Sequence, residues 1–447
     1  MRNRVRLIPL GAAAVLFSIA PVLAQSPPVI AIRNARIVPV SGPAIEKGTV
    51  VMRNGLIADV GTEAAVPADA WVLDGTGLTV YPGLVEAMGS VGIPETMPAP
   101  GMGARGAMPG TMPSAMPGAL PAAPPARGPE DRPLTNSWTR AADLVRPNER
   151  RIEALRNQGY TSAAAFPSAG IFTGQGAVIN LSGESGGRMV VENGIGQFIT
   201  MSRGGFTAFP GSLMGTIAYV RQVFLDANHY RTAKETYARA PQGLERPAYD
   251  RALEGILESK RFLIPAVNAV EIDRMLRFAA ELKVSPVLYG LHEGYKAVDK
   301  ISKAGVPVLI STKWPEPPRD RDPDEVDSMR DLELRENAPS TPAALAKAGV
   351  KFAFYSDGAE SPSRNVRRAI QKGLSPEQAL RAMTIAPAEI FGVADRLGSI
   401  EKGKIANLVV TKGDLFADRP QVQYVFVDGV RYEAPPPAMP AKPEMTQ

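Results

Sequence analysis

Short apolar segments alternate with amphipathic ones in the second half of the chain, and this alternation restricts the fold more than any other feature. The apolar segments have the length and the β-branched and aromatic content of buried strands, and the segments between them have helical periodicity. The predicted strands are residues 262–267, 286–289, 306–310 and 351–355, and the predicted helices are residues 270–282 and 293–304. Strands joined by helices lie parallel and are covered by helices, so we predict an α/β fold.

The two ends of the chain predict hairpins instead. Residues 29–80 and 398–434 are rich in strand-forming residues, and each contains a dipeptide typical of two-residue hairpin turns, Asn54-Gly55 and Asp428-Gly429. The remaining predicted elements are hairpins over residues 171–206 and helices over residues 147–159, 212–240, 247–260 and from Ser375 onward. Strands therefore gather at both ends of the chain, with mixed elements between them.

Residues 1–24 have the pattern of a secretory signal peptide. Three arginines precede an apolar stretch over residues 7–19, and small residues at 22–24 form a cleavage site. The alternative is a transmembrane anchor, which the prolines and the glycine within this segment disfavour. We therefore expect a periplasmic or secreted protein.

Charge and cysteine content exclude several classes of function. Loss of residues 1–24 removes three arginines and no acids, so the net charge falls from +5 to +2, and the chain has no long basic run. That balance predicts no nucleic-acid partner. The absence of cysteine excludes disulfides, thiol catalysis and cysteine-bound metals. No second apolar stretch of about 18 residues is present, so we expect no stable membrane span after signal removal.

Residues 94–134 are crowded with Pro, Gly, Ala and Met, as is typical of a disordered insertion. Its methionines leave open a second interpretation, Cu(I) binding by thioethers, beside that of a low-complexity loop. The tail over residues 435–447 is also proline-rich, and we expect it to be loose.

Three segments resemble one family. Residues 81–90 are similar to the pattern P-G-L-I-D-x-H-x-H, residues 379–388 to A-L-x-x-x-T-x-N-P-A, and residues 397–410 to G-S-L-x-x-G-K-x-A-D-L-V-V. These patterns belong to the amidohydrolase superfamily, and the middle of the chain resembles its imidazolonepropionase-like members more loosely. The resemblance implies a (β/α)8-type (TIM) barrel over residues 83–392 and a small β-sandwich formed by residues 25–82 and 393–434. Only about six barrel strands can be placed, so a distorted barrel is allowed.

The resemblance also implies where a catalytic metal would bind, because barrel active sites lie at the carboxyl ends of the strands. Zn²⁺ or another divalent metal serves the family, but Met88 and Ser90 stand where the first two histidines belong. Pro265 and Gly290 are the best matches to two further histidine positions, and only Asp357 keeps the family's last acidic ligand. Thioether and hydroxyl groups are poor Zn²⁺ ligands, so we expect no metal cofactor.

The chain has only two histidines. His229 lies in a polar helical stretch and is expected on the surface, whereas His292 follows a predicted strand and could face the barrel mouth. Asp357 is a candidate general base or, alternatively, a turn cap. Met88, Tyr289 and Phe354 are candidates to fill the mouth.

These matches imply two hypotheses for function. The first is a non-catalytic binding or partner subunit, whose partner is an active amidohydrolase relative or a second copy of the chain, with a small-molecule ligand. The alternative is a metal-poor or metal-independent hydrolase of C–N bonds in small amides, cyclic amides or dipeptides, with Asp357 and His292 in the site.

A competing motif is the segment Gly183–Gly187, which matches the G-x-S-x-G of serine hydrolases around Ser185. That motif requires a strand before it and a helix after it. A strand-like segment follows here, so a glycine-rich hairpin turn is the favoured interpretation.

Overall fold

The computed structural model describes residues 29–94, 132–201, 209–317, 326–359, 361–417 and 420–433. The predicted signal peptide, most of the predicted insertion over residues 94–134 and the predicted tail over residues 435–447 lie outside these ranges. Among the described residues, no helix has both the length and the apolar composition needed to cross a bilayer.

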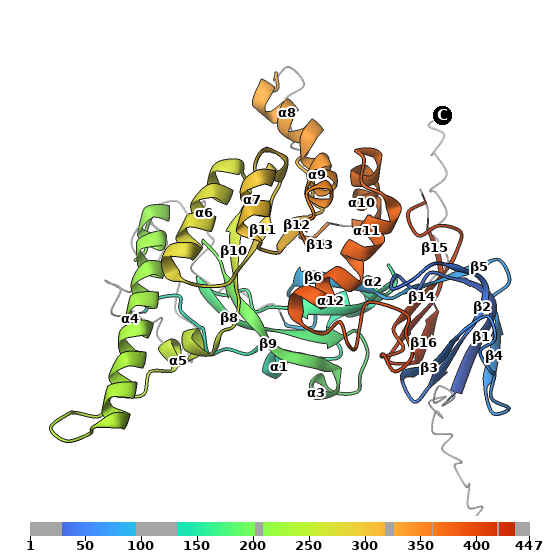
Figure 1. Cartoon of the computed structure of the whole chain (residues 1–447), viewed down its shortest axis with the longest axis horizontal. Coiled ribbons are helices and arrows are strands. Elements are labelled where there is room, and N and C mark those ends of the chain that lie inside the picture. The colour runs from blue at the N-terminus through green and yellow to red at the C-terminus, as the bar shows by residue number, and fades with distance from the viewer. Residues whose placement is uncertain are drawn as a thin grey trace, which may run out of the picture.

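One eight-stranded sheet combines strands from both ends of the chain, at the right of Figure 1. Its strands are β1 (Val29–Ile37), β2 (Ile45–Arg53), β3 (Leu56–Gly61), β4 (Trp71–Asp74), β5 (Leu78–Pro82), β14 (Leu408–Lys412), β15 (Gln421–Val427) and β16 (Val430–Glu433). The order is β16-β15-β14-β5-β1-β2-β3, and β4 also pairs with β1. The predicted hairpin turns are confirmed, since Arg53 pairs with Leu56 and Val427 with Val430.

A second eight-stranded sheet forms the α/β part of the molecule. Its strands, in spatial order, are β13 (Phe352–Tyr355), β12 (Val308–Ser311), β11 (Pro286–Gly290), β10 (Phe262–Ala266), β9 (Val190–Ile199), β8 (Phe172–Asn180), β7 (Tyr160–Ala165) and β6 (Leu84–Gly89). The predicted parallel pairing is confirmed from β10 to β13, and β9 also pairs parallel with β10. β8 runs antiparallel to both its neighbours: its pairing with β9 confirms a predicted hairpin within residues 171–206, and its pairing with β7 is an addition to that prediction. The end strands β6 and β13 contact each other.

Helices lie between and against these strands (Figure 1). They are α1 (Ala141–Leu144), α2 (Arg150–Arg156), α3 (Gly186–Met189), α4 (Leu213–Arg239), α5 (Arg251–Glu258), α6 (Ala269–Leu282), α7 (Val298–Ala304), α8 (Met329–Asn337), α9 (Thr341–Lys347), α10 (Pro362–Gln371), α11 (Pro376–Met383) and α12 (Ile385–Phe391), with 3-10 turns η2 (Gly294–Lys296) and η3 (Ala338–Ser340). The helix predicted over residues 293–304 is instead η2 followed by α7. The predicted start of α11 is confirmed, because the Ser375 hydroxyl accepts a hydrogen bond from the Gln378 backbone N–H.

Both faces of the second sheet are buried, which explains its nearly continuous apolar strands. One face, with Leu263, Val287 and Leu309, packs together with Met88 and Tyr355. The other face packs against the helices. Phe354 belongs to this helix-facing side, so the expectation that it fills the mouth is wrong, because alternate residues of a strand point to opposite faces. Its neighbour Tyr355 takes the inner position instead.

Candidate functional site

A cavity of about 600 Å³ lies where β6 and β13 end. It brings together three of the residues singled out in the sequence, Met88, Ser90 and Asp357. Glu86 and Arg151, which sequence reasoning did not select, also line it. Both strands reach the cavity with their carboxyl ends, the position at which α/β folds place their sites.

Glu86 is a buried acid in the middle of β6, with 1% of its surface exposed. Its Oε1 atom accepts a 2.7 Å hydrogen bond from the backbone N–H of Ser356, while its Oε2 atom is buried without a hydrogen-bond partner. Burial raises the pKa of Glu86 from 4.5 to about 8. The side chain is therefore mainly a neutral carboxylic acid at pH 7, with one oxygen available to a ligand.

Asp357 lies just after β13 in an exposed turn, where its φ angle is 52°. Its Oδ2 atom accepts a 2.9 Å hydrogen bond from the hydroxyl of Ser311, the last residue of β12. That hydroxyl accepts in turn from the backbone N–H of Lys313 at 3.1 Å. The carboxylate is thus held across two neighbouring strand ends while remaining accessible to a ligand.

Ser90 is held by a guanidinium group. Arg151, on α2, donates to the Ser90 hydroxyl at 2.8 Å, to the Ser90 carbonyl at 3.1 Å and to the Ile93 carbonyl at 2.7 Å. It also donates to Oε1 of Glu149 at 3.0 Å. The permanently charged guanidinium of Arg151 therefore lies against the Ser90 hydroxyl, at a position where the family pattern has a histidine.

Met88 is almost fully buried and packs with Phe166 and Tyr355. Rings continue from there along the inner face: Phe166 lies 5.6 Å from Phe198, Phe198 lies 5.3 Å from Tyr289, and Tyr289 lies 6.4 Å from Tyr355, measured between ring centroids. Met88 lines the cavity, whereas Tyr289 lies in the ring contacts beside it, and both stay candidates to fill a barrel mouth. The cavity is thus lined by a thioether and aromatic rings as well as by acidic groups.

Pro265 and Gly290 carry no side-chain donor for a metal. Pro265 pairs with Tyr289, and Gly290 pairs with Ala266 and Ile310 on the helix-facing register. At the carboxyl end of β11, the residue that reaches the inner face is therefore Tyr289, whose hydroxyl donates to the Ile199 carbonyl at 3.0 Å.

His292 follows β11 and is mostly enclosed. Its Nε2 atom is buried without a hydrogen-bond partner, and its ring centroid lies 6.3 Å from that of Trp314. Burial lowers the pKa of His292, and this effect outweighs the opposing influence of the Asp357 charge. The imidazole is therefore neutral at pH 7, near Asp357 but outside the group of residues that line the cavity.

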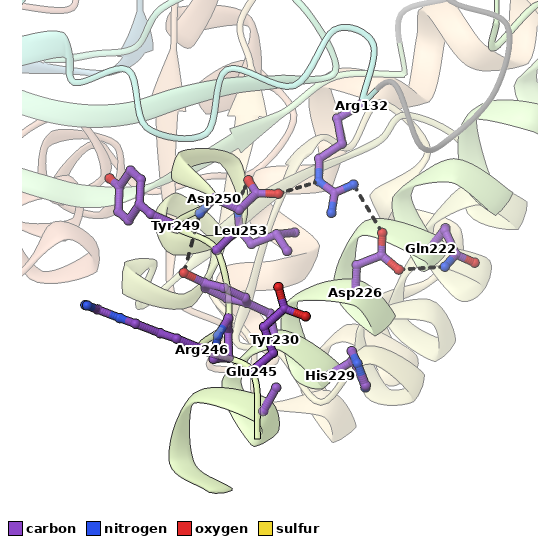
Figure 2. Close-up of a pocket in the computed structure, with 13 residues that line it drawn as sticks. Arg132, Gln222, Asp226, His229, Tyr230, Glu245, Arg246, Tyr249, Asp250 and Leu253 are labelled. Carbon is purple, nitrogen blue, oxygen red and sulfur yellow. Dashed lines mark hydrogen bonds and ion pairs between the residues drawn. The ribbon is translucent and has the colours of Figure 1, made fainter. Parts of the chain in front are cut away.

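His229 is exposed on α4, as expected, and lines a different cavity of about 850 Å³ beside the segment that leads into α5. Figure 2 shows Arg132 between the two acids of this cavity, at 3.4 Å from Asp226 and 3.2 Å from Asp250. Gln222 also donates to Asp226. These polar groups are paired with one another.

Ser185 lies exposed in the connection between β8 and β9, just before the one-turn helix α3. The antiparallel pairing of β8 with β9 confirms the predicted hairpin. The Ser185 carbonyl accepts a hydrogen bond from the Arg188 backbone N–H at 3.1 Å, as in a local turn. The surroundings are those of a hairpin connection.

The donor set at the β6–β13 cavity does not fit a divalent metal. Met88 and Ser90, at the first two histidine positions of the family pattern, supply a buried thioether and a hydroxyl bound to a guanidinium group. The matches on β10 and β11, Pro265 and Gly290, supply no side-chain donor. Within the described ranges, no three His, Cys, Asp or Glu side chains come together as a metal site. The surviving polar groups are suited instead to hydrogen bonding with an organic ligand.

Comparison with known proteins points to one family. The model of the amidohydrolase family matches residues 273–431. An adenine deaminase of Moorella thermoacetica is 48% identical over 64 residues, which are 14% of this chain and 10% of that protein. An imidazolonepropionase of Flavobacterium johnsoniae is 39% identical over 82 residues, 17% of this chain and 20% of that protein. The matches thus span no more than about a fifth of these relatives.

A solved structure resembles the chain over nearly its whole length. The crystal structure of an amidohydrolase from Thermotoga maritima aligns with a TM-score of 0.70 at 27% identity, covering 90% of this chain and 100% of that one. A prolidase structure aligns with a TM-score of 0.51 at 15% identity, covering 91% and 99%, which is a likeness of fold alone.

Proposed function

The chain belongs to the amidohydrolase superfamily, and we propose that it uses the strand-end cavity to bind a small organic molecule without a catalytic metal. The observation that carries this proposal is the Arg151–Ser90 hydrogen bond. At a position where the family pattern has a metal-binding histidine, a hydroxyl is bound to a fixed positive charge. A second cation placed there would be repelled by the guanidinium.

The remaining groups support ligand binding. Glu86 presents a buried oxygen with no hydrogen-bond partner, and Asp357 presents an accessible carboxylate. Phe198 and Tyr355 supply apolar surface on the same cavity. A mostly apolar pocket with a few polar groups is the usual form of a small-molecule site.

Metal content is the direct test. The protein, purified without a histidine tag, is incubated with Zn²⁺, Mn²⁺, Fe²⁺ or Ni²⁺, desalted and measured by elemental analysis. We expect well under one metal per chain. About one metal per chain, lost on Asp357→Ala, would contradict the proposal.

A second candidate function is metal-independent hydrolysis of C–N bonds. It is favoured by one observation: a neutral acid, Glu86, and an accessible carboxylate, Asp357, line the same cavity. Such a pair could give a proton to a leaving nitrogen and take one from water. The test is turnover of small amides, cyclic amides and dipeptides by metal-depleted protein. Activity that falls at least a hundredfold in Asp357→Asn would support this function, and no turnover would exclude it for these substrates.

We further propose that the second sheet is a distorted (β/α)8-type barrel and that the first sheet belongs to a small β-sandwich. The contact between β6 and β13 and the Glu86–Ser356 hydrogen bond support closure. The likeness to the Thermotoga amidohydrolase structure supports the same architecture.

Export and partnership also remain proposals. The pattern over residues 1–24 supports a periplasmic or secreted protein. If the chain has no catalytic metal, it could still act in an assembly with a partner. That partner would be an active amidohydrolase relative or a second copy of the chain. Purification from the native host tests this, and the repeated absence of any relative or self-oligomer would argue against it.

A further inference from the structure

We infer that the ligand of the β6–β13 cavity carries an amine or amidine group, whose N–H donors bind Oε2 of Glu86 and the carboxylate of Asp357. This inference rests on the proposed small-molecule function and specifies the chemistry of the ligand.

The first support is the free oxygen of Glu86. This side chain is 1% exposed and lines the cavity, yet its Oε2 atom has no hydrogen-bond partner. Buried polar atoms in folded proteins nearly always have a partner, and one without a partner at a cavity wall marks a place for a ligand atom. The proton of the neutral acid leaves when an N–H group donates to this oxygen, and a cationic nitrogen favours that loss because it stabilises the carboxylate.

The second support is the charge around Glu86. Burial and the charge of Asp357 raise the pKa of Glu86, and burial and the charge of Glu86 raise the pKa of Tyr160 on β7. Glu86 already accepts a hydrogen bond from the Ser356 backbone N–H. Burial and the charge of Asp357 keep Glu86 neutral in the empty cavity, and a bound cation would favour its ionised form by offsetting both effects.

Arg151 does not supply that cation to Glu86. Its guanidinium donates to the Ser90 hydroxyl, to two backbone carbonyls and to Glu149. With these donors already engaged, Arg151 is also a poor site for the carboxylate of a ligand. The cavity therefore favours a positively charged or N–H-rich group over an anionic one.

The third support is the aromatic wall. Phe166, Phe198 and Tyr355 line the same cavity as the two acids. Aromatic faces attract ammonium and amidinium groups and also pack against a short apolar body. We therefore expect a small amine with an apolar or aromatic body.

Benzylamine is a suitable probe, with benzyl alcohol as its neutral counterpart of similar size. Isothermal titration at pH 7 should give a dissociation constant at least tenfold lower for benzylamine. Glu86→Gln should raise the benzylamine value at least tenfold. The control Glu316→Gln changes an exposed acid that pairs with Arg368, and it should leave the value unchanged.

If Glu86→Gln does not fold, Asp357→Asn keeps the inference testable, because this residue is exposed in a turn, and it should weaken benzylamine binding at least threefold. Benzyl alcohol binding as tightly as benzylamine would overturn the amine inference while leaving small-molecule binding intact. Failure of both probes, and of a wider panel of neutral and anionic small molecules, to bind or to shift the melting temperature would overturn the proposed function itself.

Discussion

The backbone N–H of Ser356 donates a 2.7 Å hydrogen bond to Oε1 of Glu86, and this bond links the residue after β13 to the interior of β6. β6 and β13 are the two end strands of the second sheet. The acid that lines the cavity therefore also helps to hold the two edges of the sheet together.

Glu86 should make stability depend on pH. Below about pH 4.5 it is protonated in both folded and unfolded chains, and above about pH 8 it is ionised in both. Between these values the folded chain keeps a proton that the unfolded chain releases, so the free energy of unfolding falls as the pH rises, by on the order of 1 kcal/mol per pH unit.

Urea unfolding at pH 5.5, 6.5 and 7.5 measures this effect in the wild type and in Glu86→Gln. We expect the variant to become more stable relative to the wild type with each step, because glutamine does not titrate. Parallel pH profiles for the two proteins would contradict the assignment.

Arg151 should stabilise the segment that follows β6. Arg151→Met removes donors to the Ser90 hydroxyl and to the carbonyls of Ser90 and Ile93, and we expect a loss of about 1–3 kcal/mol. Ser90→Ala removes only the hydroxyl and should cost less, about 0.5–1.5 kcal/mol. Chemical denaturation of both variants and of the double variant gives the coupling between the two side chains. If the stability losses of the two single variants add up to that of the double variant, the Ser90 hydroxyl contributes nothing to its contact with Arg151.

Gly55 should be intolerant of a side chain, because the two hairpin turns of the first sheet pack against each other. It has a φ angle of 80°, and a Cβ atom there would lie 2.7 Å from Oδ1 and 3.1 Å from the carbonyl oxygen of Asp428. Gly55→Ala should therefore cost about 2–3 kcal/mol, combining backbone strain with crowding.

Gly77 is a matched control, with a φ angle of 75° and no atom within 4 Å of its added Cβ. Gly77→Ala should show the backbone penalty alone, about 1 kcal/mol. Thermal or urea unfolding compares the two variants, and equal losses would show that the contact between the turns does not matter.

Local signals predicted the hairpins well, because Asn54-Gly55 and Asp428-Gly429 determine their own turns. The order of strands from β10 to β13 likewise follows from apolar segments separated by helices. The long antiparallel strand β8 could be predicted only as part of a hairpin with β9, since its pairing with β7 depends on tertiary packing.

The candidate site was predicted less completely. Met88, Ser90 and Asp357 were found because they occupy positions of a family pattern. Glu86 had a detectable signal, a charged residue within an apolar strand, since unpaired buried acids are rare. Arg151 had none, because it meets Ser90 only when α2 packs near the end of β6. Whether Tyr289 or Gly290 faces inward depends on a one-residue register that apolar content alone does not determine.

Asn407 connects the two sheets and gives the last prediction. This buried residue stands where the family pattern A-D-L-V-V has an acid. Its Nδ2 atom donates to the Ser162 hydroxyl at 2.9 Å and to Oδ1 of Asn180 at 2.8 Å, while its Oδ1 atom accepts from the Asp428 backbone N–H at 2.8 Å.

Asn407→Ala would leave these buried partners unsatisfied, so we expect a loss of about 2–4 kcal/mol. Asn407→Asp should also destabilise, because a carboxylate replaces the amide donor that faces the Asn180 oxygen. Urea denaturation checks both variants, and Asn180→Ala in the Asn407→Asp background should recover part of the loss by removing that opposing oxygen. An aspartate variant as stable as the wild type would mean that Asn180 can reverse its amide and donate instead, so that the network would accept either residue.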